Sequence, residues 1–226
     1  MHPARFPIAL AGLALLALLT ACQGDDDADA TAVEVRFETV GADDGERSAN
    51  GLLFTGGTLI VSEIQFSADL TAGGSVDRSR ERVVTYDLAT GLPVGDAPAF
   101  DLPAGDYRDV YLGVELRDED ATPSIVAEGS FVEADGATEA PIRFEFNSGE
   151  VFEAEAEGPV AVEPGTTAVA SVRLRPEQWF AGISAERLAG ASRDAEGVIV
   201  ISERSNEAIF DVVADGLDVA TDIRFE

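Results

Sequence analysis

The chain has 226 residues, with 43 Asp and Glu against 15 basic residues, and its formal net charge is −28. All the basic residues are Arg, and the only His, Met and Cys are His2, Met1 and Cys22. Beyond residue 22 the chain therefore lacks the groups for a Ser–His–Asp triad, a Lys Schiff base, the usual Cys/His zinc site or a P-loop, and its charge disfavours nucleic acid as a partner.

The first segment has the pattern of a secretory signal. Arg5 precedes an uncharged, apolar stretch, and the next charge is Asp25. The stretch ends in Leu19-Thr20-Ala21-Cys22, which resembles the bacterial lipobox. The resemblance implies that residues 1–21 are a signal peptide cleaved after Ala21, and that the Cys22 thiol carries the lipid. Gln23 at the next position implies sorting to the outer membrane. An uncleaved transmembrane anchor is the alternative interpretation.

Residues 22–32 are predicted to form the lipidated Cys and a short acidic tether. Asp25, Asp27 and Asp29 alternate as in the first half of a calcium loop. The pattern then fails, because Ala30 replaces the required Gly and Arg36 replaces the bidentate Glu. The segment therefore favours a solvated tether.

Residues 33–226 are predicted to form one domain built from short strands. Apolar and polar residues alternate with the period of two that is typical of a half-buried strand. Strands are predicted at 33–38, 58–66, 82–88, 110–116, 124–132, 142–146, 151–156, 168–174 and 197–202. Gly, Pro and Asp turns separate them. The pattern predicts an all-β fold, mainly an antiparallel Greek-key sandwich, with a short C-terminal helical element.

One local motif supports the sandwich. Leu102-Pro103-Ala104-Gly105-Asp106-Tyr107 resembles a tyrosine corner, in which a Tyr hydroxyl bonds a backbone group slightly upstream. Gly105 would provide the sharp turn. This pattern predicts a structural role for Tyr107; the alternative is a catalytic acid.

The C-terminal quarter shifts towards helix. Trp179-Phe180 contains the only Trp and is predicted to plug one end of the sandwich; the alternative is a sugar-stacking platform. Ser184 is a predicted cap for a helix over 185–191. Asn206 is a predicted N-cap of a second helix, whose apolar face holds Ile209, Phe210, Val212 and Val213 and which ends near Gly216.

The lipobox, the Phe100–Tyr107 segment and Trp179-Phe180 followed by a strand and a capped helix resemble a group of uncharacterised bacterial envelope lipoproteins. The resemblance implies a β-rich domain displayed from a membrane, with no known activity, cofactor or catalytic residue.

Three functions remain open from the sequence. The first is a non-enzymatic binding or structural module of the cell envelope, with a glycan or an envelope protein as ligand. Ca²⁺ is a further possibility, at Asp118-Glu119-Asp120 or Asp43-Asp44, although each of these clusters is also typical of a solvated loop. The second is a pilin-like assembly subunit that accepts a strand at an open sheet edge. The third is a glycoside hydrolase that uses two carboxylates.

Overall fold

A computed structural model describes residues 30–39, 47–134, 136–156, 158–165, 167–217 and 221–225. In this part of the chain strands predominate and form two sheets, accompanied by three short helices. The smaller sheet has the order β12-β10-β1-β4, with β1 (Ala30–Thr39), β4 (Ala99–Pro103), β10 (Thr167–Leu174) and β12 (Thr221–Phe225). The all-β prediction with a small helical element is confirmed.

The larger sheet has the order β11-β7-β6-β2-β5-β8, and β3 and β9 also pair with β2 and β5. Its strands are β2 (Leu52–Leu70), β3 (Ser75–Asp87), β5 (Gly105–Leu116), β6 (Ile125–Val132), β7 (Glu139–Phe146), β8 (Val151–Glu155), β9 (Val160–Val162) and β11 (Ile199–Ile201). The helices are α1 (Pro176–Trp179), α2 (Ala185–Ala189) and α3 (Glu207–Ala214).

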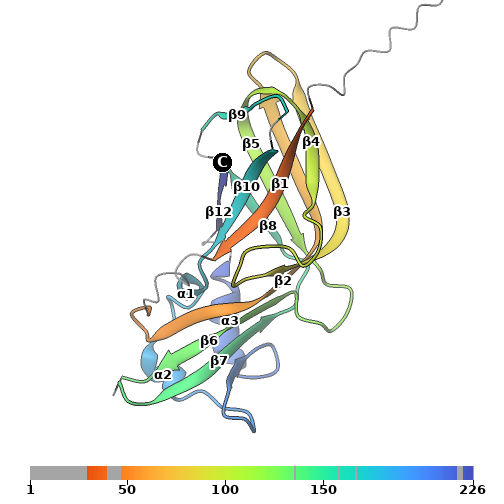
Figure 1. The fold of residues 1–226 in the computed structure, drawn as a ribbon. Coiled ribbons are helices and arrows are strands. Elements are labelled where there is room, and N and C mark those ends of the chain that lie inside the picture. The colour runs from red at the N-terminus through yellow and green to blue at the C-terminus, as the bar shows by residue number, and fades with distance from the viewer. Residues whose placement is uncertain are drawn as a thin grey trace, which may run out of the picture.

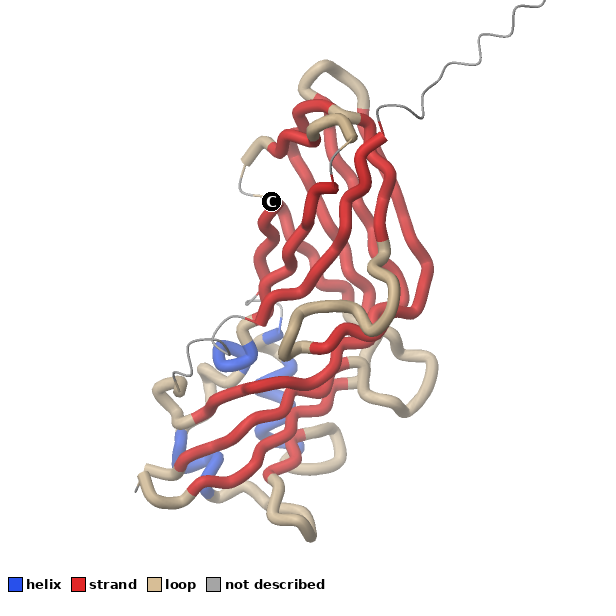
Figure 2. Tube along the Cα trace, in the orientation of Figure 1, coloured by secondary structure: helices blue, strands red, loops and turns tan. Residues whose placement is uncertain are grey.

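The molecule has two lobes, and strand β2 is long enough to run through both, as Figure 1 shows. Residues 52–59 pair with β6, and residues 61–70 pair with β5. The second half lies in the sandwich lobe, where β2, β3, β5, β8 and β9 face the smaller sheet. The first half lies in the helix-covered lobe, where β2, β6, β7 and β11 carry the three helices. Figure 2 shows all three helices beside this lower part of the sheet.

The packing of the two sheets in the sandwich lobe follows from the alternation of buried and exposed side chains along its strands. On β1, Val33, Val35 and Phe37 are buried and point to the facing sheet, while Arg36 is exposed. On β5, Leu112, Val114 and Leu116 are buried in the same way. Each such side chain contributes about 1.5–3 kcal/mol when it leaves water, so the two apolar faces hold the sheets together.

The helix-covered lobe has one apolar sheet face, and aromatic rings fill the space below the helices. Phe144 of β7 lies 6.0 Å from Trp179, 5.8 Å from Phe180 and 6.1 Å from Phe210, measured between ring centroids. Phe54 of β2 lies 5.3 Å from Phe180. These contacts join one sheet to helices α1 and α3 and to the residue after α1.

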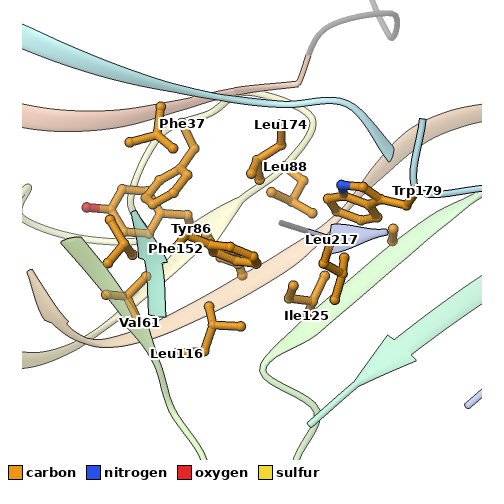
Figure 3. Packing of buried hydrophobic residues seen from close by; sticks show 14 of the residues in the cluster. Phe37, Val61, Tyr86, Leu88, Leu116, Ile125, Phe152, Leu174, Trp179 and Leu217 are labelled. Atoms are coloured by element: carbon orange, nitrogen blue, oxygen red, sulfur yellow. The ribbon is translucent and has the colours of Figure 1, made fainter. Parts of the chain in front are cut away.

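The two lobes share one buried cluster. Figure 3 shows Phe37, Tyr86 and Phe152 of the sandwich lobe, with Leu174 and Leu88 between them and Trp179. Leu217, which follows α3, packs in the same region as Trp179. Because the apolar cluster is continuous, the lobes are joined by packing as well as by β2.

Most strands overlap the segments in which the alternation predicted them. β2, β3 and β5 begin six, seven and five residues before their predicted starts, and β4, β9 and β12 lie in segments for which no strand was predicted. β1 pairs parallel with β10, and β11 with β7, whereas the other described pairs are antiparallel. Strands far apart in the sequence need no hairpin and are free to pair in parallel. β1 begins at Ala30, within the segment predicted as tether, and Ala30–Ala32 pair with β4.

The predicted cap at Ser184 is confirmed, because its side chain accepts a hydrogen bond from the Arg187 N–H. Asn206 does precede α3, but its side chain makes no cap bond. Its amide instead donates to the Ser192 and Val200 carbonyls, and its oxygen accepts from the Ser192 N–H. The prediction of a capping side chain is therefore wrong: Asn206 pins the loop before β11, and its backbone has a left-handed φ of 55°. Among the described residues, no helix has the length and apolarity needed to cross a membrane.

Candidate functional site

The outer face of the sandwich lobe is polar and strongly acidic. Where β2, β3, β5 and β8 run side by side, the side chains that alternate with the core residues point to solvent. Cross-strand register places Glu63 beside Glu81 and Glu115, and Gln65 beside Ser79 and Gly113. In the next row, Ser67 lies beside Asp77 and Tyr111. The face therefore combines carboxylates with small hydroxyl side chains and one aromatic ring.

This face is hollowed over β2, β3 and β5. The hollow has a volume of about 390 Å³ and is lined by Gln65, Phe66, Ser67, Asp77, Arg78, Ser79 and Tyr111. Small side chains contribute to the space, because Ser67 and Ser79 in the lining are shorter than their neighbours Gln65 and Arg78. We call it the sheet hollow.

Tyr111 folds over Gly113, two residues along the same strand. A Cβ atom at Gly113 would lie 3.0 Å from the Tyr111 hydroxyl oxygen. That hydroxyl donates a hydrogen bond to Glu153 Oε1 at 3.0 Å, from the residue that pairs with Gly113 on β8. The ring is therefore held along the sheet while Tyr111 stays partly exposed.

The hydroxyl of Tyr111 remains a donor at neutral pH. Burial raises its pKa above the ordinary value of 10.0, and the hydrogen bond and negative charge of Glu153 act in the same direction. On the opposite side of the hollow, the Ser79 hydroxyl donates to Glu63 Oε1. The sheet hollow therefore offers hydroxyl, amide and carboxylate groups around an aromatic ring.

A second, smaller hollow lies in the helix-covered lobe. It has a volume of about 160 Å³ and is lined by Ala121, Pro123, Glu145, Asn147, Ser202, Glu203 and Arg204. Asn147 Oδ1 is buried and has no hydrogen-bond partner among the described residues, while its amide donates to the Asp120 carbonyl. No aromatic ring lines this hollow, and its volume suits only a very small ligand.

The predicted tyrosine corner has the expected geometry. The Tyr107 hydroxyl donates to the Pro103 carbonyl oxygen at 2.6 Å, and the Tyr107 side chain is buried. Pro103 ends β4 in the smaller sheet, and Tyr107 lies near the start of β5 in the larger one. Gly105 makes the turn between them with a φ of +153°, which an L side chain rarely adopts. The bond thus fixes the crossover between the two sheets, and Tyr107 is not among the residues that line the sheet hollow.

Trp179 and Phe180 form no exposed platform, because they are only 1% and 0% exposed. This excludes the alternative of sugar stacking on that pair. Trp179 lies under the helices at the junction of the lobes rather than at an open end of the sandwich, and its indole N–H has no partner among the described residues.

In the acidic loop at Asp118-Glu119-Asp120, two carboxylates form ion pairs with Arg117. Arg117 Nε lies 2.6 Å from Glu119 Oε2, and Arg117 Nη2 lies 2.7 Å from Asp120 Oδ2. These bonds, with a further one from Thr122, hold the pKa of Asp120 far below its ordinary value. Within the described ranges, no group of three His, Cys, Asp or Glu side chains is placed to hold a metal ion. Asp43-Asp44, Ala21 and Cys22 lie outside the described residues.

Among the described residues, Glu177 is a carboxyl group with a raised pKa. Burial raises the pKa of Glu177, in the first turn of α1, above its ordinary value of 4.5. Its Oε1 accepts a long hydrogen bond of 3.4 Å from the Phe54 N–H. Glu177 lines neither hollow, and it is placed to join α1 to β2.

Tyr111 and the polar residues around it were not predicted as a site from the sequence. The sequence does show Tyr111 followed two positions later by Gly113, which places both on one face of the same strand. The residues that β2 and β3 add to the hollow could not be predicted, because their position depends on the cross-strand register. Comparison of the chain with protein-family models, curated proteins and solved structures gives no match.

Proposed function

We propose that the chain is a membrane-anchored envelope lipoprotein and that its β domain is a non-enzymatic binding module. The sheet hollow is its binding site, and its ligand is an uncharged sugar. The observation that carries the proposal is the Tyr111 ring, held along the sheet above Gly113 within a rim of hydroxyl, amide and carboxylate groups.

The chemistry of the rim selects the ligand class. A pyranose ring has an apolar face that packs on an aromatic ring and hydroxyl groups that both donate and accept hydrogen bonds. Gln65, Ser67 and Asp77 provide matching partners in the hollow. Arg78 is the cation in the lining, and the carboxylates of Asp77 in the lining and of Glu63 and Glu153 beside it outnumber it. The net negative charge repels an acidic sugar, so a neutral glycan fits better than an anionic one.

The anchor rests on the lipobox resemblance at Cys22 and on the position of β1. The strand begins at Ala30, so only a short segment separates the predicted lipid from the folded domain. A Cys22→Ser variant is expected to stay unprocessed and to lose the electrophoretic mobility of the mature lipoprotein. Cleavage after Ala21 and membrane association in this variant would contradict the anchor without bearing on the hollow.

The binding test uses neutral and uronic acid oligosaccharides with saturation-transfer NMR and calorimetry. We expect binding of a neutral oligosaccharide that weakens about tenfold or more in Tyr111→Ala. Tyr111→Phe should keep most of the affinity, since it keeps the ring. Leu92→Ala, at an exposed apolar residue outside the hollow, is the matched control. Equal binding by Tyr111→Ala, or preference for the acidic oligosaccharides, would contradict the proposal.

A second candidate function, an assembly subunit that accepts a strand, is favoured by one observation. Strand β3 is thirteen residues long and pairs with a strand, β2, on one side only. The last residues of β3 bond to the loop after it, through the Val94 N–H to the Thr85 carbonyl and the Asp87 N–H to the Leu92 carbonyl. Over residues 75–84 no described strand pairs with the other side of β3, so alternate N–H and C=O groups there are available to another chain.

A further inference from the structure

The open edge of β3 carries an unusual concentration of positive charge. Arg78, Arg80 and Arg82 alternate along the strand, and all three are exposed. They lie in a chain with a net charge of −28, in which Arg36, Arg47, Arg108, Arg117, Arg143 and Arg193 each form an ion pair. Among the described residues, the three β3 arginines form none: Arg78 donates to the Asp77 carbonyl and Arg80 to the Ala99 carbonyl. We call them the arginine row.

The arginine row faces the seam between the two sheets. Arg78 and Arg80 pair across the strands with Phe66 and Ile64 of β2, whose side chains are buried. Residues opposite one another in a β pair point to the same side, so these arginines lie on the inner face of the edge. The Arg80 bond to Ala99 reaches β4, the edge strand of the smaller sheet. The outer face of the same edge carries Asp77, Ser79 and Glu81.

We propose that β3 binds an extended polypeptide segment of a partner protein, added as a strand along its free edge, with acidic side chains at alternate positions that meet the arginine row. The free backbone groups and the arginines repeat with the same two-residue period, so one extended segment satisfies both. The intervening side chains of that segment face Asp77 and Glu81, which disfavours acidic residues there. The proposal rests on the second candidate function above. The edge shares Asp77, Arg78 and Ser79 with the lining of the sheet hollow, whereas Arg80 and Arg82 lie outside that lining.

A second copy of this chain is a poor occupant of the edge. Two β3 strands related by a two-fold axis pair antiparallel, and residues on the same face then lie opposite each other. In one register of such a pair, Arg80 lies opposite Arg80 of the second copy and Arg78 lies opposite Arg82. In a neighbouring register, Arg78 lies opposite Arg80. Like charges directly opposite one another destabilise a sheet, so the arginine row opposes self-association and favours an acidic partner.

Binding of synthetic peptides to the full chain tests the proposal, measured by fluorescence anisotropy. The probe alternates Glu and Thr over the length of β3. One control peptide has the same composition, but its Glu residues are consecutive. A second control keeps the alternation of Glu and Thr, but the backbone nitrogens that would donate hydrogen bonds to β3, one in every second residue, are methylated. We expect the alternating peptide to bind, and both controls to bind about tenfold more weakly or less. Equal binding of either control would overturn the proposal, since charge alone would then explain it.

Charge reversal locates the surface. We expect Arg80→Glu/Arg82→Glu to weaken binding of the alternating peptide about tenfold or more, and Arg204→Glu to leave it unchanged. Arg204 is the matched control because it is exposed, lies in the helix-covered lobe and forms no ion pair with the described residues. Neither Arg80 nor Arg82 lines the sheet hollow, so sugar binding should persist in the double variant and report its folding.

Amide hydrogen exchange provides a readout of strand addition itself. The peptide should slow exchange within residues 75–84 and leave β7 unchanged. Failure of the alternating peptide to bind, or binding without protection of β3, would overturn the proposal and leave the arginine row as a device that keeps the edge from aggregating.

Discussion

The two lobes share strand β2 but cover its apolar face in different ways. In the sandwich lobe a second sheet covers it, and two faces of alternating Val, Leu and Phe meet. In the helix-covered lobe, short helices and the aromatic rings of Phe144, Trp179 and Phe210 cover it. A sheet covering a sheet leaves strand edges and a broad outer face exposed, whereas helices can cover one face without adding an edge. The two proposed binding surfaces accordingly lie in the sandwich lobe.

The largest expected effect follows from breaking the junction between the lobes. Trp179→Ala removes a side chain that is 1% exposed and contacts both parts of the core. We expect it to lower the free energy of unfolding by about 3–5 kcal/mol, as measured by urea denaturation. Hydrogen exchange should speed up in both β1 and β7 if the lobes unfold together.

Trp179→Phe is the matched control for that experiment. The indole N–H has no partner among the described residues, so the Phe variant loses no hydrogen bond there and should lose clearly less stability. A Trp179→Ala variant that loosens only the helix-covered lobe would show that the lobes unfold independently.

The second prediction concerns the helix-covered lobe alone. A Cβ atom on Gly129 of β6 would lie 2.0 Å from the Leu53 carbonyl oxygen of β2, so Gly129→Ala forces the two strands apart. We expect a loss of about 1–3 kcal/mol and faster exchange in β6 and β7, with β1 and β5 little changed. Gly158→Ala is the control, because nothing lies within 4 Å of its Cβ position. An equal effect of both substitutions would contradict the close approach of β2 and β6.

Alternation of apolar residues predicted most strands of both lobes, because it records which face of each strand is buried. It did not predict β4 or β9, which have only five and three residues and too few alternations to be distinguished from loops. Nor did it show that β2 runs through both lobes, because Gly56 and Gly57 interrupt the pattern beside a register shift in the pairing with β6. The local alternation of apolar residues therefore predicts the individual strands, whereas the division into two lobes depends on pairing between strands that are far apart in the sequence.

The structural residues were more predictable than the binding surfaces. Tyr107 and Gly105 belong to one short motif whose geometry is local, and their roles could be predicted without knowledge of the other strands. The sheet hollow joins residues of β2, β3 and β5 that depend on cross-strand register. The arginine row is visible in the sequence, but its significance depends on β3 being an edge strand, which only the topology shows.

The third prediction compares two tyrosines of β5 in the sandwich lobe. Tyr107→Phe removes a buried hydrogen bond to the Pro103 carbonyl and should cost about 1 kcal/mol, measured by thermal and urea unfolding. Tyr111→Phe removes a bond to the exposed Glu153 side chain and should cost less. An unchanged midpoint in Tyr107→Phe would show that the corner bond does not stabilise the crossover between the sheets.

The smallest effect is a pH dependence in the helix-covered lobe. Burial raises the pKa of Glu177, so the folded state holds this proton more tightly than the unfolded state does. The stability associated with the protonated group is fully present below the unfolded pKa and is lost as pH rises through the folded pKa. Glu177→Gln keeps an oxygen to accept the Phe54 N–H but carries no charge, so it avoids that loss. Its stability relative to the unmodified chain should therefore increase as pH rises above the ordinary Glu pKa of 4.5. Glu196→Gln, at an exposed position, corrects for the general benefit of removing one negative charge from an acidic chain. Identical pH profiles for the two variants would show that Glu177 is solvated rather than buried against β2.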